Sequence, residues 1–192
     1  MTLEQTKEYA TKILTNKWVQ WVHPNLNPAQ TALVVEGDIM LEDIVSHCAR
    51  CIKLDGCCFV RNKCPPWPLH KNCHCQLLNI SPPSIKAKCA IEKFEQYVFH
   101  PINNKGKKGL FESWGYSIMD SQYLQQEFVH QAQLAYSAGE YILGVLDDHG
   151  QRINISITLK TATGEYITFK SGWMVYPNGR IVLITPFGGR IK

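Results

Sequence analysis

The sequence predicts an α+β protein in which a small N-terminal module precedes helices packed on a four-stranded antiparallel meander. Seven of the eight cysteines fall between Cys48 and Cys75. A Ser-Pro-Pro-Ser stretch at residues 81–84 interrupts any regular element. After Gly139 the apolar residues change from helical to alternating spacing. The expected parts are a helix and metal module over 1–80, a linker over 81–88 and an α+β domain over 89–192.

Composition and charge limit the classes of function. A chain of 192 residues with 45% hydrophobic residues can bury one core or two small ones. The net charge of +4 is divided between two halves, neither strongly basic, so any nucleic-acid contact needs a local basic patch. No apolar run is long enough to cross a bilayer. Because residues 1–5 begin no signal peptide, we expect a cytoplasmic protein without a membrane partner or a small-molecule ligand.

The segment from Cys48 to Cys75 has the composition of a metal-binding loop. Cys48 and Cys51 stand at C-x-x-C spacing, which places two sulfurs on one side of a tight turn. His70, Cys73 and Cys75 supply an imidazole and two more thiolates at the other end. Four such ligands close the tetrahedral shell of a structural zinc ion. We expect the four cysteines to bind Zn²⁺, with His70 competing for the fourth position.

Disulfide bonds are the alternative interpretation, because eight cysteines is an even number. Without a signal peptide, a reducing compartment is expected, and clustered thiols there more often bind metal. Cys57, Cys58 and Cys64 remain outside the predicted shell. These three cysteines could form a second, partial metal site, pack as small apolar side chains or be redox-active. The sequence does not rank these roles.

CARCIKLDG, beginning at Cys48, and PLHKNCHC, ending at Cys75, resemble the Cys/His tail of Mu-type phage head morphogenesis (minor head) proteins. In that family a C-x-x-C precedes a Leu-Asp-Gly-like turn and an H-x-x-C-x-C end. This chain departs from the pattern at Lys71, where the family has proline, and it lacks the long helical body of head proteins. The resemblance implies a phage-derived zinc module.

The N-terminal residues outside this loop have a helical pattern. Apolar residues in the range 2–22, Trp18 and Trp21 among them, recur at helical spacing. We expect this helix to pack on the rest of the protein or, as the alternative, to dock on a partner. A short strand over 32–35 and a helical turn over 39–46 are expected to follow.

The C-terminal part predicts three helices and then four strands. Apolar spacing indicates helices over 89–98, 110–114 and 121–138, and Gly139 is a typical helix end. Asn178-Gly179 is typical of a two-residue hairpin turn. Alternating residues predict the strands, at 141–146, 152–161, 165–176 and 180–185.

This half also has a family likeness. FHPINNKGKKGLFESWGYS, beginning at Phe99, and SITLKTATGEYITFKSGWMVYPNGRIVLITPFGG, beginning at Ser156, resemble an uncharacterised domain found at the C-termini of polymorphic-toxin-like proteins. That family shows an H-P…G-x-K-x-x-x-F-E-x-x-G-(F/Y) segment and a closing W-x-(I/V)…G…L-x-T-x-(Y/F). Helices ahead of a meander also resemble, more loosely, the barnase/EndoU/RelE-type ribonucleases of such toxins. The resemblance implies RNA as substrate.

Metal-independent RNA cleavage needs a base, an acid and a ligand for the phosphate. His100 is the candidate base or acid, because imidazole titrates near neutrality; a loop histidine bonded to backbone is the alternative. Lys107 and Lys108, among glycines at a helix start, are candidate phosphate ligands, and a solvated charged turn is the alternative. Glu112 is expected to pair with Lys108 on the helix surface.

The second predicted strand carries polar residues opposite its isoleucines. Because side chains alternate along a strand, these polar residues share one face. Such a face either binds a phosphodiester or is simply solvated. The predicted site on the sheet comprises Arg152, Thr158 and Thr185 for catalysis and Lys160, Trp173 and Tyr176 for substrate binding.

Together these patterns predict a phage- or toxin-derived effector that cleaves RNA without a catalytic metal and carries a structural zinc module. Its expected partners are RNA and an inhibitor or phage protein. The alternative is a non-catalytic protein, either associated with a phage head or acting as a protein-binding zinc adaptor. An oxidoreductase or metal sensor that uses the additional cysteines ranks last.

Overall fold

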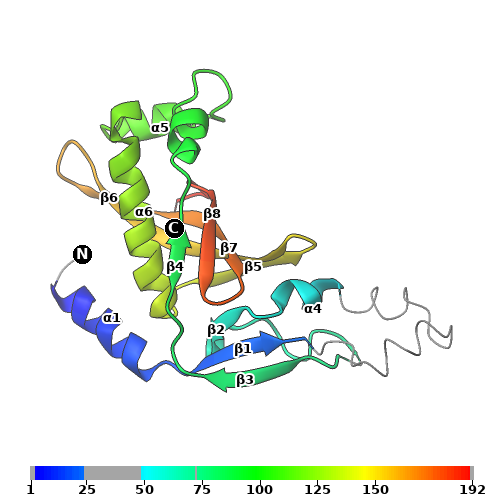
Figure 1. Ribbon diagram of the computed structural model, residues 1–192. Coiled ribbons are helices and arrows are strands. Elements are labelled where there is room, and N and C mark those ends of the chain that lie inside the picture. The colour runs from blue at the N-terminus through cyan, green and yellow to red at the C-terminus, as the bar shows by residue number, and fades with distance from the viewer. Residues whose placement is uncertain (1–2, 24–48, 72, 191–192) are drawn as a thin grey trace.

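The structure, a computed structural model, describes residues 3–23, 49–71 and 73–190. It confirms the α+β class and contains two sheets (Figure 1). Helix α6 (Ser121–Ser137) lies along one face of the larger sheet, and the smaller sheet lies at the end of the larger one. None of the helices within the described ranges has both the length and the apolar composition of a membrane span.

The N-terminal part forms a small antiparallel sheet in the order β2-β1-β3. Because β1 lies in the centre, both of its edges are hydrogen-bonded. The elements of this part are α1 (Leu3–Thr15), β1 (Trp18–Val22), α4 (Ala49–Leu54), β2 (Cys58–Val60), η1 (Arg61–Lys63) and β3 (Gln76–Ile80). The strand and turn expected over 32–35 and 39–46 lie outside the described residues.

The helix expected over residues 2–22 is wrong in its last third. It ends at Thr15, and residues 18–22 are strand β1. The sequence Trp-Val-Gln-Trp-Val is rich in aromatic and β-branched residues, which favour strands. Trp18 and Trp21 are buried, so neither indole is available to dock on a partner.

The C-terminal part forms a sheet in the order β4-β8-β7-β6-β5. The four predicted strands are present and antiparallel, and β4 adds a fifth strand parallel to β8. This fifth strand comes from residues that the sequence analysis assigned to a linker. The elements are β4 (Lys86–Lys88), η2 (Lys93–Val98), α5 (Lys107–Ser113), η3 (Ile118–Asp120), α6, β5 (Ile142–Asp147), β6 (Gly150–Lys160), β7 (Tyr166–Tyr176) and β8 (Arg180–Thr185).

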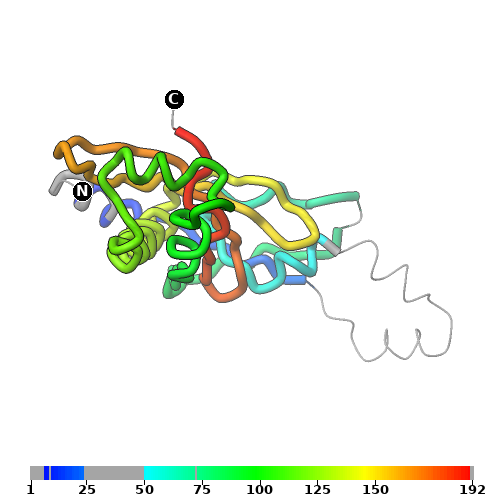
Figure 2. The backbone as a smooth tube through the Cα atoms, turned by 90° about the horizontal axis from the view of Figure 1, so that it is seen from above, coloured from blue at the N-terminus to red at the C-terminus, as the bar shows by residue number. Residues whose placement is uncertain are grey.

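Strands β6 and β7 form the long hairpin that organises this sheet. They pair from Arg152 opposite Met174 to Lys160 opposite Tyr166. The next turn, at Asn178-Gly179, has both residues at positive φ, 61° and 72°, as a two-residue hairpin turn requires. In Figure 2 the helices η2, α5 and α6 lie together on one side of the β6–β7 hairpin.

The core lies between these helices and one face of the sheet. Alternate residues of β6 point into it, so that Ile153, Ile155 and Ile157 are fully buried. Phe128 of α6 and Phe169 of β7 meet there, with ring centroids 6.0 Å apart. The predicted inner face of β6 is therefore confirmed.

Strand β6 extends past the end of β5, and there a side chain forms hydrogen bonds with its free edge. Gln131 of α6 donates to the carbonyl of Thr158 at 2.8 Å and accepts from its N–H at 2.8 Å. The amide thus takes the place of a neighbouring strand residue, which satisfies backbone groups that β5 does not reach.

Two tyrosines join the C-terminal part to the small sheet. The phenol of Tyr136, at the end of α6, donates to the carbonyl of Cys58. The phenol of Tyr141 accepts from the N–H of Val60 at 3.1 Å. Because β2 is an edge strand, these bonds satisfy backbone groups on its outer side. The two sheets consequently share one continuous core.

We expect Gly115→Ala to destabilise the protein more than Gly164→Ala. Both glycines have positive φ, 92° and 86°, so both substitutions strain the backbone. A Cβ at Gly115 would lie 2.4 Å from Ala162 Cβ, whereas one at Gly164 meets nothing within 4 Å. Urea unfolding should give a free energy of unfolding about 2 kcal/mol lower for Gly115→Ala than for Gly164→Ala. Equal losses would contradict this close approach of the α5 end to the β6–β7 turn.

Candidate functional site

Three ligand atoms of the Cys/His segment converge in the N-terminal part. Cys51 of α4 places its Sγ 3.4 Å from His70 Nε2 and 3.7 Å from Cys73 Sγ. In a tetrahedral shell with bonds of about 2.3 Å to sulfur and about 2.05 Å to nitrogen, the edges are about 3.8 Å between sulfurs and about 3.6 Å between sulfur and nitrogen. These residues could therefore hold a single metal ion among them.

The imidazole of His70 is oriented for this role by its own backbone neighbourhood. Its Nδ1 lies 2.9 Å from the carbonyl oxygen of Lys71. A carbonyl only accepts, so Nδ1 carries the proton and Nε2 keeps its lone pair on the side of Cys51. Backbone carbonyls commonly fix metal-binding histidines in this way.

Cys75 lies beside these three residues and could supply a fourth ligand. Its side chain is buried and interacts with the thiols of Cys51 and Cys73. Burial raises the pKa of both Cys75 and Cys51, as expected for thiols without a neighbouring positive charge. The indole N–H of Trp67 donates to the Cys75 carbonyl at 2.9 Å, which holds this end of the loop in place.

A buried tryptophan next to this cluster supports the fit of a metal. The indole N–H of Trp21 is fully buried and has no hydrogen-bond partner among the described residues. It lies close enough to the Cys75 thiol to oppose the rise of its pKa. Leaving a buried donor unpaired costs about 1–3 kcal/mol. A metal-bound thiolate at Cys75 would offer it an acceptor.

The predicted ligand set is thus largely brought together. Four of the five candidates, Cys51, His70, Cys73 and Cys75, gather at one place, and Cys48 lies outside the described residues. The imidazole therefore lies with the cysteines in a cluster that could hold a metal ion. The seven described cysteines are free, so the alternative of disulfide bonds finds no support among them.

The remaining cysteines of this segment pack in or against the core. Cys57 and Cys58 are buried, and their thiols lie near backbone carbonyls, those of Lys53 and Gly56, at 3.6 Å. Burial raises the pKa of Cys57 to about 12, which disfavours the reactive thiolate. Cys64 is half-buried against the same core. Of the roles left open, apolar packing fits Cys57 and Cys58.

A second feature is the face of the larger sheet that points away from α6, which we call the open face. Arg152 and Lys160 lie on it, as predicted for residues alternating with the isoleucines. The strand register adds Lys170, opposite Ser156. On the same face, at the β4 edge of the sheet, the register aligns Lys86 with Arg180. The basic residues of the open face are Lys86, Lys88, Arg152, Lys160, Lys170 and Arg180.

Sequence reasoning missed four of these six residues. Lys170 stands between the buried Phe169 and Ser171, so alternation along β7 could have placed it beside the polar residues of β6. Lys86 and Lys88 could not be found in this way, because they were assigned to a linker. Only their pairing with β8 brings them to the sheet.

The predicted residues on the open face have partners of their own. Arg152 pairs with Asp147, N to O, at 2.8 Å. The pKa of Asp147 is lowered by the His149 backbone N–H and by Arg152. The hydroxyls of Thr158 and Thr168 lie 2.9 Å apart across the hairpin. Thr185 pairs with Gly172 in the middle of the face.

His100 lies away from the open face, in the helical layer between η2 and α5. Its Nδ1 accepts from the backbone N–H groups of Ile102, at 3.1 Å, and Asn103, at 2.8 Å. The neutral ring then carries its proton on Nε2 and presents a donor there. This is the backbone-bonded loop histidine that the sequence left as an alternative. The four predicted catalytic residues are consequently divided between two layers.

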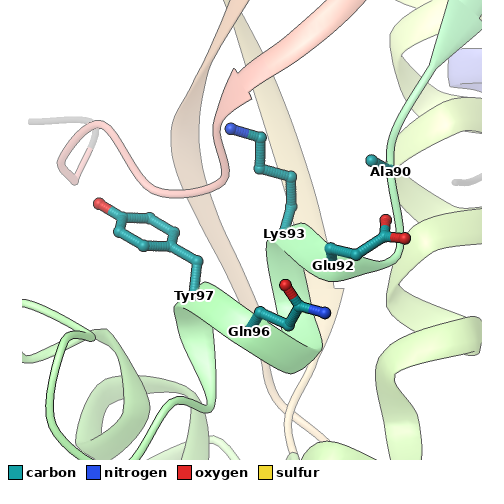
Figure 3. Close-up of a pocket in the computed structure, with 5 residues that line it drawn as sticks. All are labelled: Ala90, Glu92, Lys93, Gln96 and Tyr97. Carbon is teal, nitrogen blue, oxygen red and sulfur yellow. The ribbon is translucent and has the colours of Figure 1, made fainter.

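The predicted lysines of the loop are also in the helical layer. Lys108 pairs with Glu112 at 3.8 Å, as expected for residues four apart on a helix. The ammonium of Lys107 lies 4.9 Å from the ring centre of Tyr97, a cation–π distance. Tyr97 and Lys93 help to line an open hollow of about 310 Å³ (Figure 3).

The stacking role predicted for Trp173 does not fit its burial. Trp173 points into the core beside Ile153, where it is fully buried and donates to Ser171 Oγ at 2.8 Å. Tyr176 is on the opposite side of β7, half-buried, with the Arg180 guanidinium 4.8 Å from its ring centre. Alternation along the strand separates the two aromatic residues, and only Tyr176 faces outwards.

Comparison with known proteins assigns the larger part of the chain to a protein family. Residues 82–189 match the family described as a domain of unknown function (DUF6883). No curated protein and no solved structure matches the chain. The match begins four residues before β4, so it covers the whole five-stranded sheet and its helices.

We expect Cys73→Ser to lose the metal ion, because it leaves only three of the four ligands. Cys64→Ser is the matched control, since Cys64 lies outside the cluster. Elemental mass spectrometry of the purified full chain should find a single metal ion per chain in the unmodified protein and in Cys64→Ser. Affinity should fall as the pH falls, because thiols must lose protons to bind. Equal metal loss in both variants would argue against this ligand set.

Proposed function

The chain belongs to the DUF6883 family, a domain of unknown function, and we propose that its open face binds RNA while a structural zinc ion holds the N-terminal part. The observation that carries the proposal is the gathering of six basic residues from four strands on one face. Phosphate contacts from Lys and Arg supply most of the affinity of proteins for nucleic acid that is independent of sequence.

The length and chemistry of the open face suit an extended polyanion. Arg152 and Lys160 stand eight residues apart on one strand, which is about 26 Å. Between them lie the hydroxyls of Ser156 and Thr158, groups that contact phosphate or sugar oxygens. The net charge of the whole chain is only +4, so the basic character is local, as a binding face requires.

Zinc is the ion that best fits the Cys/His cluster. Three thiolates and one imidazole form a closed shell with no position left for a substrate, which is typical of structural zinc. Cys51 and Cys75 are buried with Trp21, so the ion would stabilise the loop between α4 and β3. The likeness to the tail of phage head proteins supports this assignment.

RNA cleavage is the more specific form of the proposal, supported by the likeness to toxin domains. Arg152, Thr158 and Thr185 share the open face, and in this proposal the guanidinium, which pairs with Asp147, would be shared with a phosphate. His100 lies in the other layer, so a base would have to come from another group or from a rearranged loop. The protein is then an effector, with an inhibitor or phage protein as its partner.

Binding is tested by removing charge from the open face. We expect the triple variant Lys88→Gln, Lys160→Gln, Lys170→Gln to bind single-stranded RNA at least about tenfold more weakly, with the slope of log affinity against log salt reduced by about 2. The control removes equal charge elsewhere, by Lys7→Gln, Lys53→Gln and Lys63→Gln. Fluorescence anisotropy over a salt series measures both. Similar losses of RNA affinity in the two triple variants would contradict the assignment of the open face as the RNA-binding surface.

Cleavage is tested in cells. We expect expression of the full chain in bacteria to stop growth and fragment total RNA, and Arg152→Ala to restore both, because losing the phosphate ligand costs about 10²- to 10³-fold in rate. His100→Ala should leave RNA fragmentation unchanged if the imidazole only bonds backbone. The melting temperatures of both variants control for folding. Normal growth and intact RNA with the folded, unmodified chain would exclude RNA cleavage as the function. The proposal of RNA binding by the open face would still stand.

A further inference from the structure

Aromatic side chains from the helical layer and the sheet gather around the end of the β6–β7 hairpin that carries Lys160. Tyr166 lies directly opposite Lys160 in the hairpin register and is 68% exposed. The phenol of Tyr116 donates to the Lys160 carbonyl at 2.6 Å. Tyr123 of α6 stacks on Tyr116, with ring centroids 6.2 Å apart and planes at 17°. We call Tyr116, Tyr123 and Tyr166 the aromatic corner.

The aromatic corner is more exposed than packing alone requires. Tyr123 is 47% exposed although its neighbour Tyr116 is buried. On the adjoining η3 turn, Ile118 is 51% and Met119 87% exposed. A group of large apolar side chains at the surface commonly marks a binding site. Tyr166, opposite Lys160 and close enough to Tyr123 to interact with it, connects this group to the basic residues of the open face.

The charges near the aromatic corner favour bases over phosphates. Burial raises the pKa of Tyr116 to about 12, and Tyr123, Glu127 and Asp120 add to the rise. The phenols of Tyr116 and Tyr123, whose pKa values are both raised, are therefore neutral at physiological pH. Asp120 accepts from the Ser117 N–H at 2.7 Å, and its negative charge would repel a phosphate. An uncharged, flat surface beside a carboxylate suits the face of a nucleobase.

We propose that the aromatic corner stacks unpaired bases and thereby makes the open face selective for single-stranded over double-stranded RNA. The inference rests on the proposed binding of RNA by the open face. In a duplex the bases stack on each other and are not free to contact an aromatic side chain, whereas a single strand can splay them out. The phosphates of the same strand then continue over Lys160 and Lys170.

The test compares a labelled single-stranded 12-mer RNA with the same strand in a duplex, by anisotropy with the full chain. We expect Tyr166→Ala with Tyr123→Ala to weaken single-strand binding by about tenfold or more, and to leave duplex binding and the salt slope unchanged. Tyr166→Phe with Tyr123→Phe keeps the rings and should bind like the unmodified protein. Melting temperatures control for folding.

The possible failures are distinguishable. If the unmodified chain binds neither RNA, the proposed function itself fails. If it binds both RNAs with equal affinity, or if the alanine pair binds the single strand as tightly as the phenylalanine pair, the open face still binds RNA but the aromatic corner does not select for single strands. A loss that is equal for single strand and duplex would also overturn the stacking role.

Discussion

The structure depends on one shared apolar core at the junction of its two sheets. Trp18 of the small sheet packs edge-on against Tyr136 of α6, with ring centroids 5.8 Å apart. The phenols of Tyr136 and Tyr141 bond to the free edge of β2. Burial raises the pKa of both phenols, so they remain neutral donors and acceptors. Removing either side of this junction would expose large aromatic side chains of the other.

The Cys/His cluster is connected to that core through β1. Trp18 and Trp21 lie on the same strand, and the first reaches the junction while the second reaches Cys75. An ion bound in the cluster would fix the loop that carries His70 and Cys73. Because Trp21 and Trp18 belong to the same buried strand, β1, this would also stabilise the packing at the junction. A small sheet of three short strands has little apolar area of its own, so a bound ion would add stability to the loop that it carries.

The open face and the core are two consequences of the same alternation. In β6, residues with odd numbers fill the core, and residues with even numbers give the polar surface. The registers of β4, β7 and β8 then bring basic residues that are distant in sequence to the same face as the even-numbered residues of β6. Among the described residues, the helices η2, α5 and α6 cover the other side of the hairpin (Figure 2).

Local patterns in the sequence were sufficient for the fold class, for the β5–β8 meander and for four members of the Cys/His cluster that could hold a metal ion, Cys51, His70, Cys73 and Cys75. Period, turn residues and ligand spacing are all expressed within short segments. The strand at 18–22 was missed, because Trp-Val-Gln-Trp-Val fits either period and only pairing with β2 and β3 selects the strand.

Tertiary structure alone decided which residues meet. It moved His100 into the helical layer, buried Trp173 and brought Lys86 beside Arg180. The sequence determined which chemistry each segment carries, because that depends on the local order of side chains. Which residues share the open face was decided by the fold, because contacts between distant strands depend on register and on which face the helices cover.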